Sequence, residues 1–379
     1  MRILYYCQHV LGVGHFHRSL EICRACSIDH QVTMIVGGPD IDIGDEPFDF
    51  LKLPGLQMDD QFSRLEPCDP ALGIDEVKQK RIATLLSFFE SSKPDCLILE
   101  LYPFGRKAFR FELTPLLEAA RTKSCKVYCS LRDILVEKKT DRWMWEERVV
   151  ATLNPYFDGL LVHADPRVVT LDSTFGPMEQ LEVPIHYTGF ITPRPRTDAR
   201  ARIRAEIGMN EEDTLIVASI GSGSVGSHLL EAVAGVARTG SETRNMHFQL
   251  FTGPYCDSAV SRRLRGYRHS HLGVEQFADN FVDWLAAADL SISMAGYNTS
   301  MNTLAAGVPA LMLPFDQNKE QRQRVERLVA DHAIRILEDG DLDSDLLAGL
   351  IDSQLQEDRY TTSINLDGAR RTVSLLETL

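Results

Sequence analysis

The sequence predicts an α/β protein built from two doubly wound halves, and three observations support this fold class. Short apolar runs alternate with longer amphipathic stretches along the 379-residue chain, which is the pattern of βαβ units in parallel sheets. Glycine-rich turns at 12–14 and 221–223 follow two of these apolar runs. The length also corresponds to two or three domains of about 150 residues each.

The first half opens with the apolar run RILYYC, which predicts a strand over 2–7. Further strands are predicted, in order, over 31–38, 95–102, 125–131 and 159–164. Apolar residues at helical spacing predict helices, in order, over 16–26, 76–94, 110–123 and 143–156. The polar segment 39–70 is expected to be mostly loop with one short strand.

The second half repeats this alternation. A strand is predicted from 214 into a glycine-rich turn that ends at 224, and another over 246–254 with its turn. The remaining elements are predicted, in order, as a helix over 228–238, a helix and strand over 283–296, a helix over 298–307, a strand over 308–315, and helices over 318–332 and 366–378. Prolines and arginines over 186–208 indicate a linker that enters a helix.

Composition excludes several classes of protein. The formal net charge of −14 disfavours a nucleic-acid partner. The N-terminus has no apolar core of signal-peptide length, and no strong membrane signal is present. The eight cysteines are scattered in apolar contexts, so we expect free thiols, no metal and a cytoplasmic location. No cofactor is expected.

The strongest site signal lies in the second half. Gly296, Asn298 and Thr299 stand between a predicted strand and helix, where Asn298 or Thr299 can cap the helix and its first amides suit a diphosphate. The next strand ends at Asp316 and Gln317, with Gln321 one turn later, and such a pair can hold sugar hydroxyls. The turn Gly221-Ser222-Gly223 is less specific, because a generic βα turn fits it as well as a phosphate-binding turn.

The stretch AAADLSISMAGYNTSMNTLAAGVPALMLPFDQNKEQ resembles the donor-sugar signature of GT-B glycosyltransferases, most closely the MurG-like, family 28-type group. The resemblance implies a GT-B fold, in which two Rossmann-like domains face a central cleft. It is specific near 280–325 and 12–19, and the segments 100–113 and 130–135 resemble a less studied branch of predicted glycosyltransferases. The implied domains are an N-terminal acceptor-binding domain (1–187), a linker (188–197), a C-terminal nucleotide-sugar domain (198–360) and a C-terminal helix (361–379) that can pack back on the first.

The resemblance also implies roles for donor-site residues. Gly296 and Thr299 would hold the donor diphosphate, with Gly221 and Ser222 facing it from the other loop. Asp316 and Gln317 would hold the sugar. The residues that would contact the base are Phe281 and Val282, in a loop before the next helix. Asn302 stands where the family usually has a ribose-binding glutamate, and an asparagine can bond a ribose hydroxyl without charge assistance.

His15 is the candidate catalytic base. It follows Gly14 at a predicted strand-to-helix junction, and a histidine in this place would deprotonate the acceptor hydroxyl in the GT-B scheme. A capping or packed histidine is the alternative. His17 would point elsewhere if the helix has begun, and a zinc site at His9, His15 and His17 has no well-placed fourth ligand.

Charged residues at strand ends of the first half are acceptor-site candidates. These are Glu100, Arg106, Arg132 and Asp133, in addition to Gly14. Arg106 and Arg132 are suited to a carboxylate or phosphate on the acceptor, and surface ion pairing is the equally good alternative.

Together these features predict a transferase. The expected reaction moves a sugar from a UDP-sugar, such as UDP-N-acetylglucosamine or another UDP-hexose, to the hydroxyl of a small-molecule or glycan acceptor. It is expected to invert the anomeric centre without a metal. Two alternatives stay open: a nucleotide-sugar hydrolase or 2-epimerase on the same fold, and a non-catalytic nucleotide-sugar-binding protein.

Overall fold

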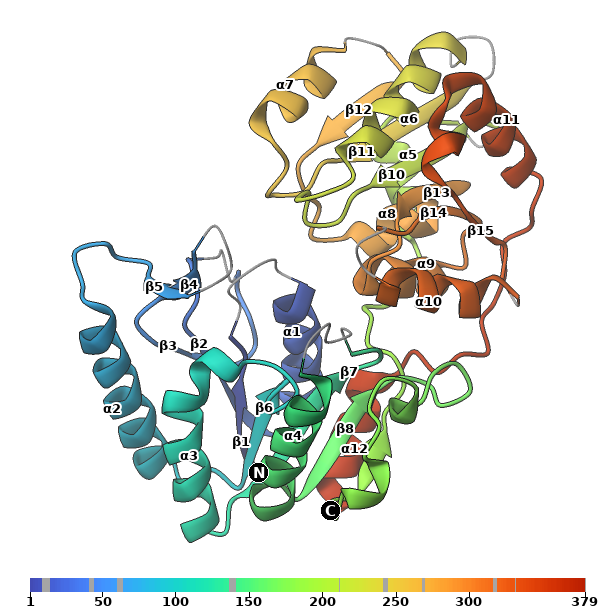
Figure 1. Cartoon of the computed structure of the whole chain (residues 1–379). Helices are drawn as coiled ribbons and strands as arrows, with labels where there is room; N and C mark the ends of the chain where they lie inside the picture. Colours follow the sequence, from blue (N-terminus) through green and yellow to red (C-terminus); the bar gives the residue numbers. More distant parts are fainter. Residues whose placement is uncertain are drawn as a thin grey trace. The chain divides into compact units, whose positions relative to one another are not determined.

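The chain folds into two compact units, each with its own parallel sheet (Figure 1). The computed structural model describes residues 1–8, 14–40, 44–59, 64–135, 141–210, 212–240, 245–267, 270–315, 319–330 and 332–378. Unit 1 comprises Met1–Ile191 and Asn365–Leu379, and unit 2 comprises Thr192–Ile364. The predicted α/β class with two doubly wound sheets is confirmed.

Unit 1 contains a seven-stranded parallel sheet in the order β3-β2-β1-β6-β7-β8-β9. Its strands are β1 (Arg2–Tyr6), β2 (Gln31–Val36), β3 (Asp49–Lys52), β6 (Cys96–Glu100), β7 (Lys126–Arg132), β8 (Gly159–His163) and β9 (Ile185–Tyr187). A separate antiparallel pair consists of β4 (Leu56–Met58) and β5 (Leu65–Pro67). The direction of strand order reverses between β1 and β6, which makes this the switch point of the sheet.

Helices cover both faces of the unit 1 sheet. They are α1 (Gly14–Cys26), α2 (Ile74–Ser92), α3 (Arg110–Thr122), α4 (Arg142–Tyr156) and α12 (Gly368–Thr378), with short 3₁₀ turns η1 (Lys107–Phe109), η2 (Leu171–Ser173) and η3 (Met178–Gln180). Helices α1 and α12 pack together against β1, where Phe16 and Val373 join Ile3 in one core. Thus the last helix of the chain completes the first unit.

Unit 2 contains a six-stranded parallel sheet in the order β12-β11-β10-β13-β14-β15. Its strands are β10 (Thr214–Ser219), β11 (Met246–Phe251), β12 (Leu272–Glu275), β13 (Leu290–Met294), β14 (Ala310–Leu313) and β15 (Ile334–Ile336). Its helices are α5 (Ala199–Glu206), α6 (Ser227–Gly240), α7 (Ser258–Gly266), α8 (Phe281–Ala287), α9 (Tyr297–Ala306), α10 (Lys319–Val329) and α11 (Ser344–Gln354), with the 3₁₀ turn η4 (Asp339–Leu342). Here the switch point lies between β10 and β13.

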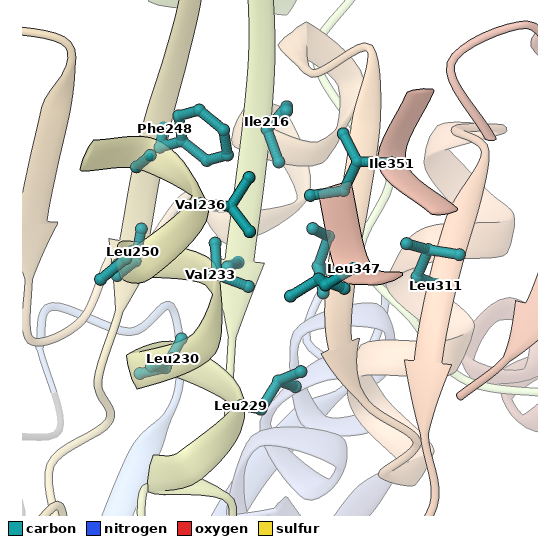
Figure 2. Packing of buried hydrophobic residues seen from close by; sticks show 14 of the residues in the cluster. Ile216, Leu229, Leu230, Val233, Val236, Phe248, Leu250, Leu311, Leu347 and Ile351 are labelled. Atoms are coloured by element: carbon teal, nitrogen blue, oxygen red, sulfur yellow. The ribbon is translucent and has the colours of Figure 1, made fainter. Parts of the chain in front are cut away.

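Alternation along the strands of unit 2 fills two cores. Ile216 on β10 faces α6 and α11 and belongs to one core with Val233, Val236, Leu347 and Ile351 of these helices (Figure 2). The neighbouring residues of β10 face the other way, into a core with α5 and α8. Each large apolar side chain buried in this way stabilises the unit by about 1.5–3 kcal/mol.

The elements that the sequence did not predict include helices α7 and α11 and the four edge strands of the two sheets. β3, β9, β12 and β15 stand at the ends of the two sheets, and their residues are largely half-buried or exposed. An edge strand lacks the continuous apolar run that marks a central parallel strand, so its sequence resembles loop. The central strands, which are fully buried, were predicted because burial on both faces requires apolar residues throughout.

Candidate active site

Polar side chains gather at the switch point of each sheet. In unit 1 these side chains come from α1, which follows β1, and from the end of β6. In unit 2 the glycine-rich turn follows β10, and the N-terminus of α9 follows β13. Open α/β sheets bind ligands at such points, because the connections on either side leave to opposite faces and open a crevice between them.

In unit 1 the imidazole of His15 is paired with a buried carboxylate. Its Nδ1 lies 2.5 Å from Oε1 of Glu100, whose side chain is fully buried. Nη2 of Arg18 also lies 3.0 Å from Nδ1, but the contact with the carboxylate is shorter. A carboxylate accepts hydrogen bonds only, so we assign the proton to Nδ1, and in the neutral imidazole Nε2 is then the unprotonated nitrogen. Within the part of the chain that the structure describes, Nε2 makes no hydrogen bond, and the side chain is 24% exposed. This is the tautomer that a general base needs.

Two arginines complete the surroundings of Glu100. Arg18, one turn after His15 on α1, places Nη2 3.0 Å from Oε1. Arg106 donates to Oε2 from Nη2 at 2.9 Å and from Nε at 3.3 Å. Both oxygens of the carboxylate are therefore held by charged donors, which compensates the cost of burying it.

These contacts shift the pKa values in opposite directions. Burial lowers the pKa of His15 to about 4, and Glu100 opposes this shift. Burial alone would raise the pKa of Glu100, but His15, Arg106 and Arg18 hold it well below its usual range. At neutral pH the pair therefore consists of a neutral imidazole and an ionised carboxylate, and the imidazole can accept a proton.

A buried chain of hydrogen bonds runs beneath this site. Tyr5 donates its hydroxyl to Oγ of Ser130 at 2.8 Å, and Ser130 lies 2.7 Å from Nε2 of His163. Nδ1 of His163 lies 2.9 Å from the hydroxyl of Thr188. A single proton order satisfies every group, because Thr188 can donate onward to the carbonyl of Gly189. Burial lowers the pKa of His163 to about 3, so it stays neutral.

The other acceptor-side candidates occupy separate positions. Gly14 is the exposed first residue of α1. Arg132 ends β7, and its Nε lies 3.9 Å from Oδ1 of the buried Asp133. No measured contact joins this pair to Glu100 among the described residues. The structure thus groups Glu100 and Arg106 with His15, and it shows Arg132 next to Asp133 instead.

A hollow of about 280 Å³ opens beside α1 at the carboxyl ends of β2 and β3. Phe16, Gly37, Lys52 and Asp69 are among its lining residues. The buried guanidinium of Arg81 holds the backbone at this hollow. It donates to the carbonyls of Gly37 at 2.8 Å and Pro54 at 2.7 Å, and to Glu112. Phe16 lines this hollow from α1, whereas His15 is not among the residues that line it.

In unit 2 two glycine turns pack against each other. Gly223 has φ +92°, and a Cβ added there would lie 2.5 Å from the carbonyl oxygen of Thr252. The amide of Tyr255 donates to the carbonyl of Ser222 at 2.8 Å. Only glycine permits this approach, so the turn after β10 is fixed on the turn after β11. Gly221, at φ +64°, stays exposed at the edge.

The N-terminus of α9 faces the same turn. Gly296 is its N-cap residue and provides no side-chain cap, and a Cβ there would meet open space. A Cβ built on Gly221 would lie 4.0 Å from Oγ1 of Thr299, so the turn after β10 approaches the first turn of α9. Asn298 lies half-buried beside them. Exposed glycine backbone, a hydroxyl and an uncapped helix start are thus close together, an arrangement that suits an anion.

Two further donor-side residues have partners within unit 2. Oδ1 of Asn302 accepts a hydrogen bond from Thr192 at 2.7 Å. Oε1 of Gln321 accepts from the backbone amide of Phe315 at 3.0 Å. Asp316 and Gln317, predicted to hold the sugar, lie outside the described residues, as does His9.

The prediction that Phe281 and Val282 stand in a loop is wrong. Both belong to α8, where Val282 is buried and Phe281 packs edge-on against Phe251 with ring centroids 5.4 Å apart. The loop before α8 instead carries Phe277, which is 46% exposed. That loop is attached to the glycine turns, because the amide of Gly253 donates to the carbonyl of Gln276 at 2.8 Å.

Sequence reasoning missed Arg18, Tyr5, Ser130, His163 and Phe277. Arg18 offered a usable signal, since it follows His15 by three residues on a predicted helix and residues so spaced share a face. Tyr5, Ser130 and His163 come from three separate strands, so only the folded sheet reveals their contact. Within the described part of the chain, no cluster of three metal-ligating side chains occurs, and no helix is long and apolar enough to cross a membrane.

Comparison with solved structures defines the class. MurG of Acinetobacter baumannii aligns over 100% of this chain and 99% of its own, with a TM-score of 0.58 and 14% identity. The UDP-GlcNAc 2-epimerase of Methanocaldococcus jannaschii aligns over 100% of both chains, with a TM-score of 0.61 and 13% identity. Such low identities establish the fold alone. With two doubly wound units that each gather polar groups at a switch point, this is a protein of the GT-B fold.

Sequence comparison identifies the family of the second unit. Residues 217–374 match the glycosyltransferase family 28 C-terminal domain. A curated relative in Carboxydothermus hydrogenoformans is 26% identical over 182 residues, which cover 47% of this chain and 45% of the relative. That relative is a UDP-N-acetylglucosamine–N-acetylmuramyl-(pentapeptide) pyrophosphoryl-undecaprenol N-acetylglucosamine transferase. The expected resemblance to the MurG-like, family 28-type group is confirmed by this domain match and this relative, and the match spans less than half the length of the relative.

Proposed function

We propose that the protein is an inverting, metal-independent glycosyltransferase that moves a sugar from a UDP-sugar to an acceptor hydroxyl. The observation that carries the proposal is the His15–Glu100 pair at the switch point of unit 1. Glu100 holds the proton on Nδ1, which leaves Nε2 with its lone pair toward solvent. The family 28 domain of unit 2 supports the assignment of the donor.

The reaction requires one displacement. Nε2 of His15 takes the proton of the acceptor hydroxyl, and the acceptor oxygen forms a bond to the anomeric carbon of the sugar. The bond from that carbon to the diphosphate oxygen breaks, and UDP leaves with the electron pair. Amides at the start of α9, with Thr299, Gly221 and Ser222, stabilise the charge that develops on the diphosphate.

The remaining donor-site and acceptor-site residues are assigned as follows. Phe277 takes the place proposed for Phe281 and Val282, because it is the exposed aromatic side chain in the loop before α8. Asn302 would bond the ribose after giving up Thr192. Asp316 and Gln317 would hold the sugar, and Gln321 would position the segment that precedes them. On the acceptor side we assign Gly14 and Arg106, with Arg132 and Asp133 at the periphery.

A histidine substitution with a matched control tests the proposal. UDP release is followed with a panel of UDP-, GDP-, ADP- and dTDP-sugars, with and without a panel of hydroxylated acceptors. We expect His15→Ala to slow acceptor-dependent release about 10²–10⁴-fold while UDP binding is unchanged. His17→Ala, two residues along the same helix, should leave the rate within a few-fold.

Each other outcome has a definite meaning. Release that needs no acceptor identifies a nucleotide-sugar hydrolase, in which His15 activates water. Binding of the UDP-sugar without any release, unchanged in His15→Ala, identifies a non-catalytic binding protein. Acceptor-dependent transfer that survives His15→Ala at full rate removes His15 as the base.

A further inference from the structure

Arg106 is held beside the candidate base with one end of its guanidinium unused. Nε and Nη2 both donate to Oε2 of Glu100, at 3.3 and 2.9 Å. Among the described residues Nη1 has no hydrogen-bond or ion-pair partner, and the side chain is 12% exposed. A planar guanidinium offers five N–H donors, and those of Nη1 are available to a ligand.

The same carboxylate places this unused end next to His15. His15 contacts Oε1 of Glu100 and Arg106 contacts Oε2, so the two side chains lie at the two oxygens of one carboxyl group. A ligand whose hydroxyl reaches Nε2 of His15 therefore brings its neighbouring atoms close to Arg106. His15 and Arg106 can therefore contact adjacent groups of the same ligand.

Two guanidinium groups share the single carboxylate of Glu100. The two guanidinium groups of Arg18 and Arg106 face the single carboxylate of Glu100, while the neutral His15 adds no charge. Burial raises the pKa of Cys7 to about 12 and that of Tyr5 well above its usual value, so these neighbours are neutral as well. Arg106 thus shares the carboxylate of Glu100 with Arg18, and an anion on a ligand would give the largely buried Arg106 a partner of its own.

The backbone that carries Arg106 is preformed. Arg106 has φ +58° and Leu101 has φ +65°, both in the left-handed region that few side chains adopt. The turn between them is closed by the amide of Gly105, which donates to the carbonyl of Leu101 at 2.7 Å. A ligand that binds Nη1 therefore does not have to order the arginine first, because the turn and Glu100 already fix it.

We propose that the acceptor carries an oxyanion, a carboxylate or a phosphate, close to its reactive hydroxyl, and that Arg106 binds this group while His15 takes the hydroxyl proton. The inference rests on the proposed transferase function and narrows its acceptor to anionic hydroxy compounds. Arg132 is not included in this site, because its described ion pair is with Asp133 and not with Glu100.

Protection of His15 from chemical modification tests the proposal without a donor or a known acceptor. Diethylpyrocarbonate modifies neutral imidazoles, and the modified His15 peptide is quantified by mass spectrometry at pH 7. The probes are inorganic phosphate and lactate, each compared with chloride at equal ionic strength. A probe at ten times its apparent Kd should slow modification of His15 about tenfold.

Variants separate Arg106 from general charge effects. Arg106→Gln should abolish the protection and Arg106→Lys should retain part of it. Arg110→Gln removes an exposed charge four residues away. In this variant the added anion should protect His15 as well as it does in the wild type. Protection by phosphate alone assigns a phosphorylated acceptor, and protection by lactate alone assigns a hydroxy acid.

Two results overturn the proposal. One is modification of the wild type at the same rate in phosphate, lactate and chloride. The other is equal protection in the wild type and in Arg106→Gln. Neither result touches the transferase assignment, which UDP release measures separately. Conversely, protection in a protein that transfers no sugar keeps the anion site and removes the proposed reaction.

Discussion

Glu100 determines the chemistry of unit 1 at the scale of single residues. Its carboxylate is fully buried. His15 and Arg18 of α1 contact one oxygen, and Arg106 in the turn after β6 contacts the other. The consequence is a histidine whose proton is fixed on Nδ1 and whose pKa is lowered to about 4. A surface histidine would spend part of its time protonated near neutral pH and could not act as a base in that state.

Buried neutral histidines also predict how stability depends on pH. His15 and His163 have pKa values lowered to about 4 and about 3, whereas an unfolded histidine titrates near 6.5. The unfolded chain therefore binds more protons below pH 6.5, so stability is full above that pH and declines as the pH falls toward 4. Glu100, whose pKa is held below its usual range, adds a loss only below about pH 4.3.

The test is the urea midpoint of unfolding between pH 7.5 and 4.5. His163→Gln should flatten the decline, because it removes one of the histidines that take up a proton on unfolding. His228→Gln, at an exposed histidine of α6, is the control and should leave the slope unchanged. An identical slope in wild type and His163→Gln contradicts the prediction.

At the scale of elements, the loops at the switch points matter more than the strands that carry them. Backbone hydrogen bonds join the loops after β10, β11 and β12 of unit 2. The amide of Tyr255 donates to the carbonyl of Ser222, and the amide of Gly253 donates to the carbonyl of Gln276. Two of these loops contain glycines with positive φ whose side-chain positions are filled by the neighbouring backbone. The loops therefore form one rigid edge opposite the start of α9.

Two glycine substitutions separate folding from ligand binding at this edge. Gly296→Ala introduces a Cβ into open space at φ −67°, so stability should change by less than about 1 kcal/mol. UDP affinity should nevertheless fall, because the diphosphate needs that space. Gly73→Ala, at another open helix N-cap in unit 1, should change neither property.

Gly223→Ala gives the opposite result, since its Cβ would overlap the backbone of Thr252 at positive φ. We expect a loss of about 1–3 kcal/mol in the stability of unit 2. Thermal unfolding and UDP titration by calorimetry measure both quantities. Unchanged UDP affinity in Gly296→Ala would move the diphosphate site elsewhere.

At the scale of the whole molecule, the chain passes between the units twice, and both passages are anchored in unit 1. The amide of Phe190 donates to the carbonyl of Asn365 at 2.8 Å, and the amide of Gly368 donates to the carbonyl of Phe190 at 3.0 Å. The last helix then contributes Val373 and Leu376 to the core beneath α1. Unit 1 is thus discontinuous in sequence, whereas unit 2 is one continuous segment.

Removal of residues 365–379 should therefore destabilise unit 1 and spare unit 2. Each large apolar side chain lost from the core costs about 1.5–3 kcal/mol, and the cover over α1 is lost as well. Calorimetry should show a lowered transition for unit 1, while the segment 192–364 alone should fold and bind UDP. A truncated protein that unfolds as the wild type does contradicts this prediction.

The sequence by itself determined the fold class, the buried central strands, most of the helices beside them and the family 28 resemblance of the second unit. Each follows from local pattern, because a parallel strand buried on both faces must be apolar and a helix beside it must be amphipathic. His15 and the Gly296 turn also stood out, since strand-to-helix junctions place their residues at the edge where such sheets bind ligands.

Only the tertiary structure decided which of these residues act together. Glu100 and His15 are 85 positions apart, and their pairing depends on β1 and β6 being neighbours in the sheet. The tertiary structure also decides that Arg106, and not Arg132, contacts Glu100 beside the candidate base. It decides as well that the exposed aromatic residue before α8 is Phe277. Local patterns report burial, but contacts across a sheet depend on strand order, which no local pattern contains.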